Sequence, residues 1–194
     1  MSVQPVVRNT SGVFANQRSA ERDSWWPVMS QARSMQETPD GNVVYSDQSP
    51  NLRRATIDSN GASAIWTGLF PLRGYRSGPI EITTAFVPVP NSFADDAIDF
   101  EIQASITPIG AAAFVAPVIV GDVFRVVLGD ANDGNLVQMR RVLFPASGFQ
   151  DGDYLTIVLE ATADFTGGGG PPAAVIDFTG VYAQESVARG TREI

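Results

Sequence analysis

The stretch VFRVVLGDANDGNLVQMRRVLF, residues 123–144, places two apolar runs on either side of a cluster of turn-forming residues. Val123–Leu128 and Leu136–Phe144 are rich in β-branched and other apolar residues, which favour strands. Between them, residues 129–135 contain two glycines, two aspartates and two asparagines, which accept the backbone angles of tight turns. This pattern predicts a β-hairpin, and similar runs separated by turns lie on both sides of it.

Eight segments of strand length follow one another between residues 55 and 184. No long segment has the periodicity of a helix, and turns rich in glycine and proline separate the strands. The pattern therefore predicts an all-β fold, an antiparallel eight-stranded β-sandwich of jelly-roll type with an extended N-terminal arm. The predicted strands are Ala55–Asp58, Ala64–Phe70, Pro79–Val87, Ala97–Ile106, Val123–Leu128, Leu136–Phe144, Asp153–Ala163 and Ala174–Gln184.

Alternation of apolar and polar residues identifies the predicted core. A strand presents successive side chains to opposite faces of its sheet, so the apolar residues of one face are expected to pack together. We expect Phe100, Ile102, Ile157 and Leu159 to be buried. The full alternating set is Ile80, Ile82, Thr84, Phe86, Ile98, Phe100, Ile102, Ala104, Ile106, Leu155, Ile157, Leu159, Ala161, Ile176, Phe178 and Tyr182.

The N-terminal quarter of the chain differs from the remainder. Residues 1–52 show little alternation and are predicted to form a largely irregular arm. A β-sandwich domain is expected at 53–185, followed by a C-terminal tail at 186–194.

Two adjacent tryptophans, Trp25 and Trp26, lie in this otherwise polar arm. Large aromatic side chains in a polar segment need a surface to cover them. Two interpretations remain: the pair packs on the sandwich of its own chain, or it anchors on a neighbouring subunit, where tryptophan is enriched at interfaces.

The composition excludes several classes of function. The chain of 194 residues has a net charge of −8, all of its 13 basic residues are arginine, and histidine, cysteine and lysine are absent. The absent residues supply most nucleophiles, general bases and transition-metal ligands, so we predict no enzyme activity, no catalytic residue, no metal ligand and no cofactor. The negative charge argues against nucleic acid as a partner. No apolar run approaches the roughly 18 residues of a membrane span.

The arginines and most loop aspartates are expected at opposite ends of the sandwich, although Asp122, Asp151, Asp153 and Glu193 fall at the arginine end. If consecutive strands alternate in direction, the connections near residues 59–63, 88–96, 129–135 and 164–173 share one end, which we call the aspartate end. All nine arginines beyond residue 50 then map to the other half of the molecule, the arginine end.

Two interpretations of the arginine end remain open. Either the arginines satisfy carboxylates of their own chain, or they dock on an acidic partner surface through bidentate contacts. The second interpretation predicts an interface formed by Trp25, Trp26, Arg53, Arg54, Arg73 and Arg76.

The aspartate-rich stretch at 130–135 offers oxygen atoms to a calcium ion, but its spacing is wrong for an EF-hand. Counted from Asp130, Gly134 is the fifth residue, whereas the glycine of an EF-hand loop is the sixth. Turn formation therefore explains this composition better than calcium binding does.

Several short motifs give the chain a resemblance to a known class of protein. They are IWTGLF at 65–70, GPIEI at 78–82, GDYL at 152–155 and FTGVYA at 178–183. With the strand order and the polar arm, they resemble the jelly-roll structural proteins of tailed bacteriophage virions, among which head decoration or cement proteins are the nearest case. The resemblance covers roughly residues 53–185 and rests on strand order and texture.

The resemblance implies a non-enzymatic protein of the virion, bound to an icosahedral shell. The implied partners are the major capsid protein or other virion proteins, and further copies of the chain itself, with a trimer favoured. The basic arm of RNA-packaging capsid proteins is missing, because Arg8, Arg18, Arg22 and Arg33 are scattered. That difference argues against contact with the genome.

A second class of function stays open, because sandwiches of this type often bind sugars. The alternative is a carbohydrate- or receptor-binding module of a phage tail or fibre. Such a site presents aromatic platforms beside polar groups. Trp66 and Tyr75 are the candidate platforms, although packing in the core or at its rim explains both of them better.

Overall fold

Twelve strands in two antiparallel sheets make up the described part of the chain. The computed structural model describes residues 28–31, 35–49, 52–72, 78–89, 95–128, 137–145, 150–165 and 173–185. These ranges contain no helix, and therefore no helix long and apolar enough to cross a membrane. The all-β antiparallel sandwich predicted from the sequence is confirmed.

The strands range in length from the two residues of β2 to the twelve of β12. All eight predicted strands are present within a few residues of their expected bounds, as β4 to β7 and β9 to β12. The strands are β1 (Val28–Gln31), β2 (Gln36–Glu37), β3 (Val43–Ser49), β4 (Leu52–Ile57), β5 (Ser63–Pro71), β6 (Ile80–Val89), β7 (Ala97–Thr107), β8 (Val118–Ile119), β9 (Phe124–Val127), β10 (Gln138–Phe144), β11 (Tyr154–Asp164) and β12 (Ala174–Glu185).

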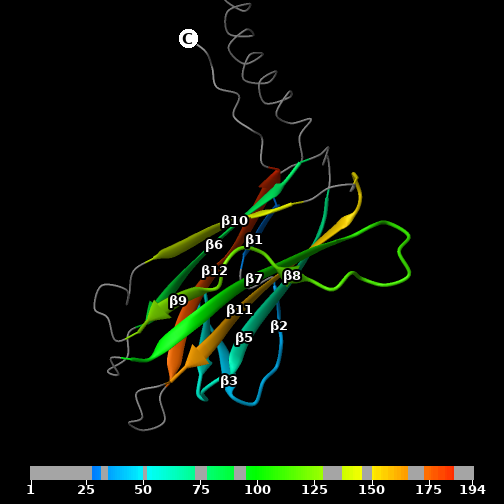
Figure 1. The fold of residues 1–194 in the computed structure, drawn as a ribbon. Coiled ribbons are helices and arrows are strands. Elements are labelled where there is room, and N and C mark those ends of the chain that lie inside the picture. The colour runs from blue at the N-terminus through cyan, green and yellow to red at the C-terminus, as the bar shows by residue number, and fades with distance from the viewer. Residues whose placement is uncertain are drawn as a thin grey trace, which may run out of the picture.

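Each sheet contains six strands, and the two sheets face one another (Figure 1). Sheet A has the order β10-β6-β12-β4-β3, and β1 pairs with the second half of β12. Sheet B has the order β2-β5-β11-β7-β8, and β9 pairs with the first residues of β7.

The eight predicted strands are connected as a jelly roll. In chain order they alternate between the two sheets, except that β7 and β9 both belong to sheet B. Consequently β4 and β12, the first and last of the eight, are neighbours in sheet A, and β5 and β11 are neighbours in sheet B. This nested pairing is the double Greek-key arrangement of the jelly roll.

The core lies between the sheets and contains the residues that alternation predicted. Phe100, Ile102, Ile157 and Leu159 have at most 7% of their surface exposed, which confirms their predicted burial. Phe100 of sheet B stacks on Phe86 of sheet A, with ring centroids 3.6 Å apart. Such face-to-face packing makes the two sheets one hydrophobic unit.

The hairpin predicted at residues 123–144 is wrong. β9 pairs with β7 in sheet B, whereas β10 pairs with β6 in sheet A, so the chain crosses between the sheets after Leu128. Residues 128–137 connect the two strands, and this connection is longer than the about two to five residues of most hairpin loops. Both runs bury apolar residues in the same core, but they do so from opposite sides.

β12 changes the face that it buries at a β-bulge. The register with β6 shifts between Phe178 and Gly180, after which Val181 and Ala183 are buried. A bulge inserts one residue and so reverses which residues point inward. Tyr182 was predicted to lie on the core face, and the bulge places it half-buried on the outer face instead.

Residues 28–49, which the sequence pattern assigned to an irregular arm at 1–52, contribute three strands. β1 pairs with β12, β2 with β5, and β3 with β4. β2 and β3 are edge strands, and only Val43 of β3 is buried, so little alternation marks them in the sequence. Residues 1–27 and the predicted tail at 186–194 lie outside the described residues.

Candidate functional site

Arg53 of β4 joins the two sheets at one edge of the sandwich. Its guanidinium donates two hydrogen bonds to Glu37 of β2 in sheet B, Nε to Oε1 at 2.5 Å and Nη2 to Oε2 at 2.8 Å. A third, from Nη1 to Oδ1 of Asp47 in β3, measures 2.9 Å. The hydrogen bonds with Glu37 raise the pKa of Arg53 above its ordinary value. Both acceptors belong to the same chain.

Arg54, the next residue, points away from the core and is paired as well. Its Nε and Nη2 atoms donate to the two carboxylate oxygens of Asp177 in β12, at 2.7 and 2.8 Å. This bidentate contact raises the pKa of Arg54. The two described arginines of the predicted interface are therefore held by carboxylates of their own chain.

The other four residues of the predicted interface, Trp25, Trp26, Arg73 and Arg76, lie outside the described residues. The structure therefore pairs Arg53 and Arg54, both on β4, with acidic residues of β2, β3 and β12. It does not describe how the two arginines lie relative to the tryptophans.

Arg125 was assigned to the arginine half of the molecule, and that assignment is wrong. Arg125 of β9 donates to Asp99 near the start of β7, at 3.1 Å, and to Asp164 at the end of β11, at 2.5 Å. Both carboxylates lie at the aspartate end. The error follows from the hairpin, because β9 runs alongside the beginning of β7 and not alongside β10.

The connections at the aspartate end do meet as expected. The amide of Leu128 donates to the carbonyl of Asp96, and the amide of Gly61 donates to the carbonyl of Ala163. Within the described ranges, no three acidic, histidine or cysteine side chains are grouped so that they would hold a metal ion. Asp130 and Asp133, the carboxylates considered for calcium, lie outside those ranges.

Exposed apolar side chains, in contrast, gather on one side and one end of the sandwich. The described residues include twelve large hydrophobic side chains that are exposed, and all except Val44 and Leu69 fall into two adjoining groups. The first group is the apolar edge, formed by Val118, Ile119, Val123, Val137, Met139 and Leu143. The second lies on or beside the connection after β7 and contains Ile109, Phe114, Val115 and Tyr154.

The apolar edge is built around β10, the edge strand of sheet A. Met139 and Leu143 are 70% and 56% exposed on the outward face of this strand, with the exposed Arg141 between them, and Val137, directly before the strand, is 70% exposed. The segment between β8 and β9 approaches β10 closely, since a Cβ atom on Gly121 would lie 3.0 Å from Val142. Edge strands with exposed apolar residues are surfaces on which other chains pair.

The connection after β7, residues 108–117, is the apolar loop, and it is braced by a buried carboxylate. In Figure 1 this loop, in green, extends from sheet B beyond β8. Asp153 is 1% exposed; its Oδ1 accepts a hydrogen bond from the amide of Ile109, and its Oδ2 accepts one from the amide of Gln150, each at 3.0 Å. These bonds fix the beginning of the loop against the turn before β11.

The far part of the apolar loop is fixed to β7. The amide of Val115 donates to Thr107 Oγ1 at 2.9 Å, and Ser105 Oγ donates to the carbonyl of Val115 at 2.8 Å. Phe114 meets Tyr154 edge to face, with ring centroids 6.4 Å apart. Residues 107–114 and Tyr154 line an open pocket of about 260 Å³, which we call the loop pocket. The hydrogen bonds hold this pocket in place although its aromatic side chains are exposed.

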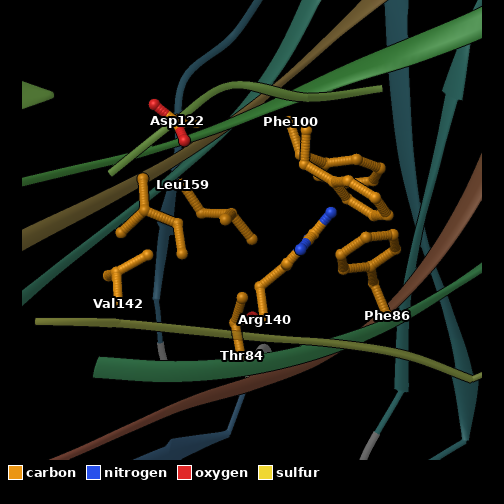
Figure 2. Close-up of a pocket in the computed structure, with 9 residues that line it drawn as sticks. Thr84, Phe86, Phe100, Asp122, Arg140, Val142 and Leu159 are labelled. Atoms are coloured by element: carbon orange, nitrogen blue, oxygen red, sulfur yellow. The ribbon is translucent and has the colours of Figure 1, made fainter. Parts of the chain in front are cut away.

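A second, smaller cavity lies between the sheets beneath the apolar edge (Figure 2). Arg140 of β10 extends into it, with Cζ 3.1 Å from the centroid of the Phe124 ring, and its guanidinium points toward Phe86 and Phe100. Burial lowers the pKa of Arg140, and its Nε atom has no hydrogen-bond partner among the described residues. The cavity measures about 20 Å³, which is room for about one water molecule. It is too small for a ligand.

The loop pocket was not found from the sequence. Residues 111–117 are apolar but have no strand pattern, and Tyr154 was noted only as part of the GDYL motif. Apolar residues in a connection that lacks a strand pattern are the signal that points to such a surface. Of the two candidate platforms, Trp66 is fully buried against Phe178, with ring centroids 4.8 Å apart, and Tyr75 lies outside the described residues.

No protein-family model matches the chain, and no curated protein matches it. Among solved structures, a Gap123 glycosylation-associated protein complex from Streptococcus agalactiae matches with 12% identity and a TM-score of 0.48. That match covers 84% of this chain and 26% of the other, so the chain spans about a quarter of that protein's length.

Two carbohydrate-binding modules are also similar. The C-terminal module of family 6 from the laminarinase LamC of Zobellia galactanivorans has 13% identity and a TM-score of 0.42, over 82% of this chain and 100% of that one. A family 35 module from Clostridium thermocellum has 12% identity and a TM-score of 0.44, over 83% and 99%. At these identities the likeness concerns the fold alone. None of these three structures is a virion protein.

Proposed function

We propose that this chain is a non-enzymatic structural protein that decorates or cements a virion shell, and that it attaches through its apolar edge. The partner is the major capsid protein or another protein of the particle. The observation that carries this proposal is the gathering of six exposed large hydrophobic residues along β8, the β8–β9 segment and β10. Monomeric soluble proteins rarely expose large apolar surfaces, and such surfaces mark protein interfaces.

The paired arginines support attachment by apolar contact. Arg53 and Arg54 already bond Glu37, Asp47 and Asp177 of their own chain. A partner carboxylate would have to displace these acceptors, so the apolar residues are the better anchors. Because salt screens charge pairs but weakens apolar contacts little, we expect attachment to persist when the salt concentration is raised.

The test replaces two anchors of the apolar edge and measures occupancy on the particle. In the variant Met139→Ser/Leu143→Ser, the amount of protein that co-sediments with purified particles should fall at least tenfold. Val44→Ser is the matched control, because Val44 is 58% exposed on β3, at the edge of sheet A opposite β10. Unchanged co-sedimentation of the double variant would refute attachment through this surface.

A truncation tests the contribution of the N-terminal residues separately. The deletion should remove residues 1–27 only, because residues 28–49 contain strands of both sheets. Loss of particle binding with retention of the folded sandwich would add the N-terminal residues to the attachment site.

A second candidate function is sugar binding at the loop pocket. The observation in its favour is the edge-to-face pair of Phe114 and Tyr154 beside an open pocket, since aromatic side chains with a polar handle suit partly wet sites. However, Thr107 Oγ1 already accepts a hydrogen bond from Val115, and no charged side chain lines the pocket. Binding on a glycan array that is lost in Phe114→Ser would establish this function instead.

A further inference from the structure

The loop pocket has the size and chemistry of a site for one large apolar side chain. Its volume of about 260 Å³ is smaller than the roughly 300–1,000 Å³ of pockets for drug-sized ligands. Gly110 and the alanines at 111–113 add little side-chain volume to its lining, and the rings of Phe114 and Tyr154 add aromatic surface. None of the lining residues is charged. An indole ring fits this description, because it combines a large apolar surface with a single hydrogen-bond donor.

Hydrogen bonds hold the loop pocket in one conformation before any side chain binds in it. Asp153 holds the amide of Ile109, and Thr107 and Ser105 hold Val115, so both ends of the apolar loop are fixed before anything binds. Even so, Phe114 remains 64% exposed and Ile109 remains 63% exposed. A rigid site that is already in its bound conformation loses little entropy on binding.

Two indole rings occur in the chain directly before the first described strand. β1 begins at Val28, and Trp25 and Trp26 precede it by three and two residues. Val28 pairs with Ala183, near the last residues of β12. β7 and β12 both run away from the aspartate end, so Val28 and the loop pocket lie at the same end of the sandwich.

The start of β1 and the loop pocket lie on different sheets of the sandwich. β1 belongs to sheet A, whereas Tyr154 points outward from sheet B, because its neighbour Leu155 is buried in the core. The two sheets of a sandwich lie about 10 Å apart, and the outer face of sheet B lies beyond that distance. An extended chain advances at most about 3.5 Å per residue, so two residues before Val28 add at most about 7 Å of reach, and a neighbouring copy is the simpler acceptor.

We infer that the loop pocket receives Trp25 or Trp26 from a second copy of this chain. The proposal goes beyond attachment to a shell, because it uses a different surface and a different partner. Each copy donates its tryptophans at one end of the sandwich and receives those of a neighbour on the outer face of sheet B. Contacts of this donor-to-acceptor kind close into a ring when the rotation between copies permits it, and a reciprocal exchange gives a two-fold dimer.

The experiment compares the full chain with two variants that remove opposite halves of the contact. The arm variant is Trp25→Ala/Trp26→Ala, and the pocket variant is Phe114→Ser/Tyr154→Ser. Leu69→Ser is the matched control, since Leu69 is 47% exposed on the outer face of sheet B but does not line the pocket. Sedimentation velocity over a range of concentrations gives the mass of each, and circular dichroism verifies that each is folded.

We expect the unmodified chain and Leu69→Ser to be oligomers with the same mass. In the arm and pocket variants the dissociation constant should rise at least about 30-fold, as for the loss of an interface hot spot. Mixing the two variants restores one intact contact, because the pocket variant still carries the tryptophans and the arm variant still carries the pocket. The mixture should show a saturable blue shift of tryptophan emission that neither variant shows alone.

Three outcomes would overturn the proposal. One is a variant that keeps the mass of the unmodified chain. Another is a mixture that shows no shift in emission at any concentration. The third is an unmodified chain that is monomeric. This result overturns the proposal both when tryptophan emission shows insertion into the pocket of the same chain and when it shows an empty pocket. None of these measurements uses particles, so their failure is distinguishable from failure of the proposed attachment at Met139 and Leu143.

Discussion

The guanidinium of Arg53 in sheet A donates two hydrogen bonds, of 2.5 and 2.8 Å, to the carboxylate of Glu37 in sheet B. The two side chains are only 21% and 20% exposed, so solvent screens the pair incompletely. The contact closes the sandwich at the edge where β2, β3 and β4 meet. Of the two interpretations of the arginine end, pairing with a carboxylate of the same chain therefore holds for Arg53.

Breaking this pair should destabilise the sandwich. We expect Arg53→Met and Glu37→Gln each to lower the free energy of unfolding, with a coupling of about 1–3 kcal/mol between them, as for hydrogen bonds to charged groups. The coupling is measured by urea unfolding of the two single variants and the double variant. A coupling near zero would mean that the two sheets are held together at this edge without the ion pair.

Removing the ring of Phe100 should be far more costly. This side chain is 2% exposed and stacks on Phe86 at 3.6 Å, so Phe100→Ala leaves a cavity between the sheets. The free energy of unfolding should fall by about 3–5 kcal/mol. Leu143→Ala is the control and should change stability little, because Leu143 is exposed at the apolar edge. Equal effects of the two substitutions would contradict the assignment of Phe100 to the core.

The bulge in β12 depends on glycine at one position. Gly180 has a φ of 128°, in a region that residues other than glycine rarely adopt. We expect Gly180→Ala to cost about 1–3 kcal/mol of unfolding free energy through backbone strain. Gly41→Ala is the matched control, because Gly41 has an ordinary φ and open space around it. Thermal unfolding of both variants checks the difference.

Tyr45 should make stability sensitive to alkaline pH. Burial raises the pKa of its phenol above the ordinary value of 10.0, and the hydroxyl accepts a hydrogen bond from the amide of Ile65 at 2.9 Å. Because the folded pKa is the higher one, the neutral phenol stabilises the fold below the unfolded pKa. That contribution is lost as the pH rises through the folded value.

The measurement compares the unmodified chain with Tyr45→Phe. The unmodified chain should lose stability relative to this variant as the pH passes 10. Parallel stability curves for the two proteins would show that Tyr45 ionises equally easily in the folded and unfolded chain.

Alternation was sufficient to place strands but not to pair them. β6, β7 and β11 were correctly located because each has one face in the core and one outside. The same pattern does not say which sheet a strand joins, so β9 and β10 were wrongly paired with each other. β2 and β3 were missed because edge strands expose most of their residues and keep little alternation.

The residues of the candidate sites could not be paired from the sequence, because they lie far apart along the chain. Arg54 and its partner Asp177 are 123 residues apart, and no local pattern connects them. Phe114 and Tyr154 likewise come together only because β7 and β11 are neighbours. Whether an apolar connection such as residues 108–117 is covered or exposed depends on the tertiary structure, so the sequence alone does not reveal it.

The position of β12 has a consequence for how the protein is made. This last strand lies in the middle of sheet A, between β6 on one side and β4 with β1 on the other. During translation, β4 and β6 therefore leave the ribosome before β12, the strand that lies between them. In the same way, β5 and β7 emerge before β11, which lies between them in sheet B. Sheet B is complete only after β11 has emerged, and sheet A only after β12 has emerged. Until then the nascent chain exposes unpaired strand edges, and we expect it to be prone to aggregation at this stage.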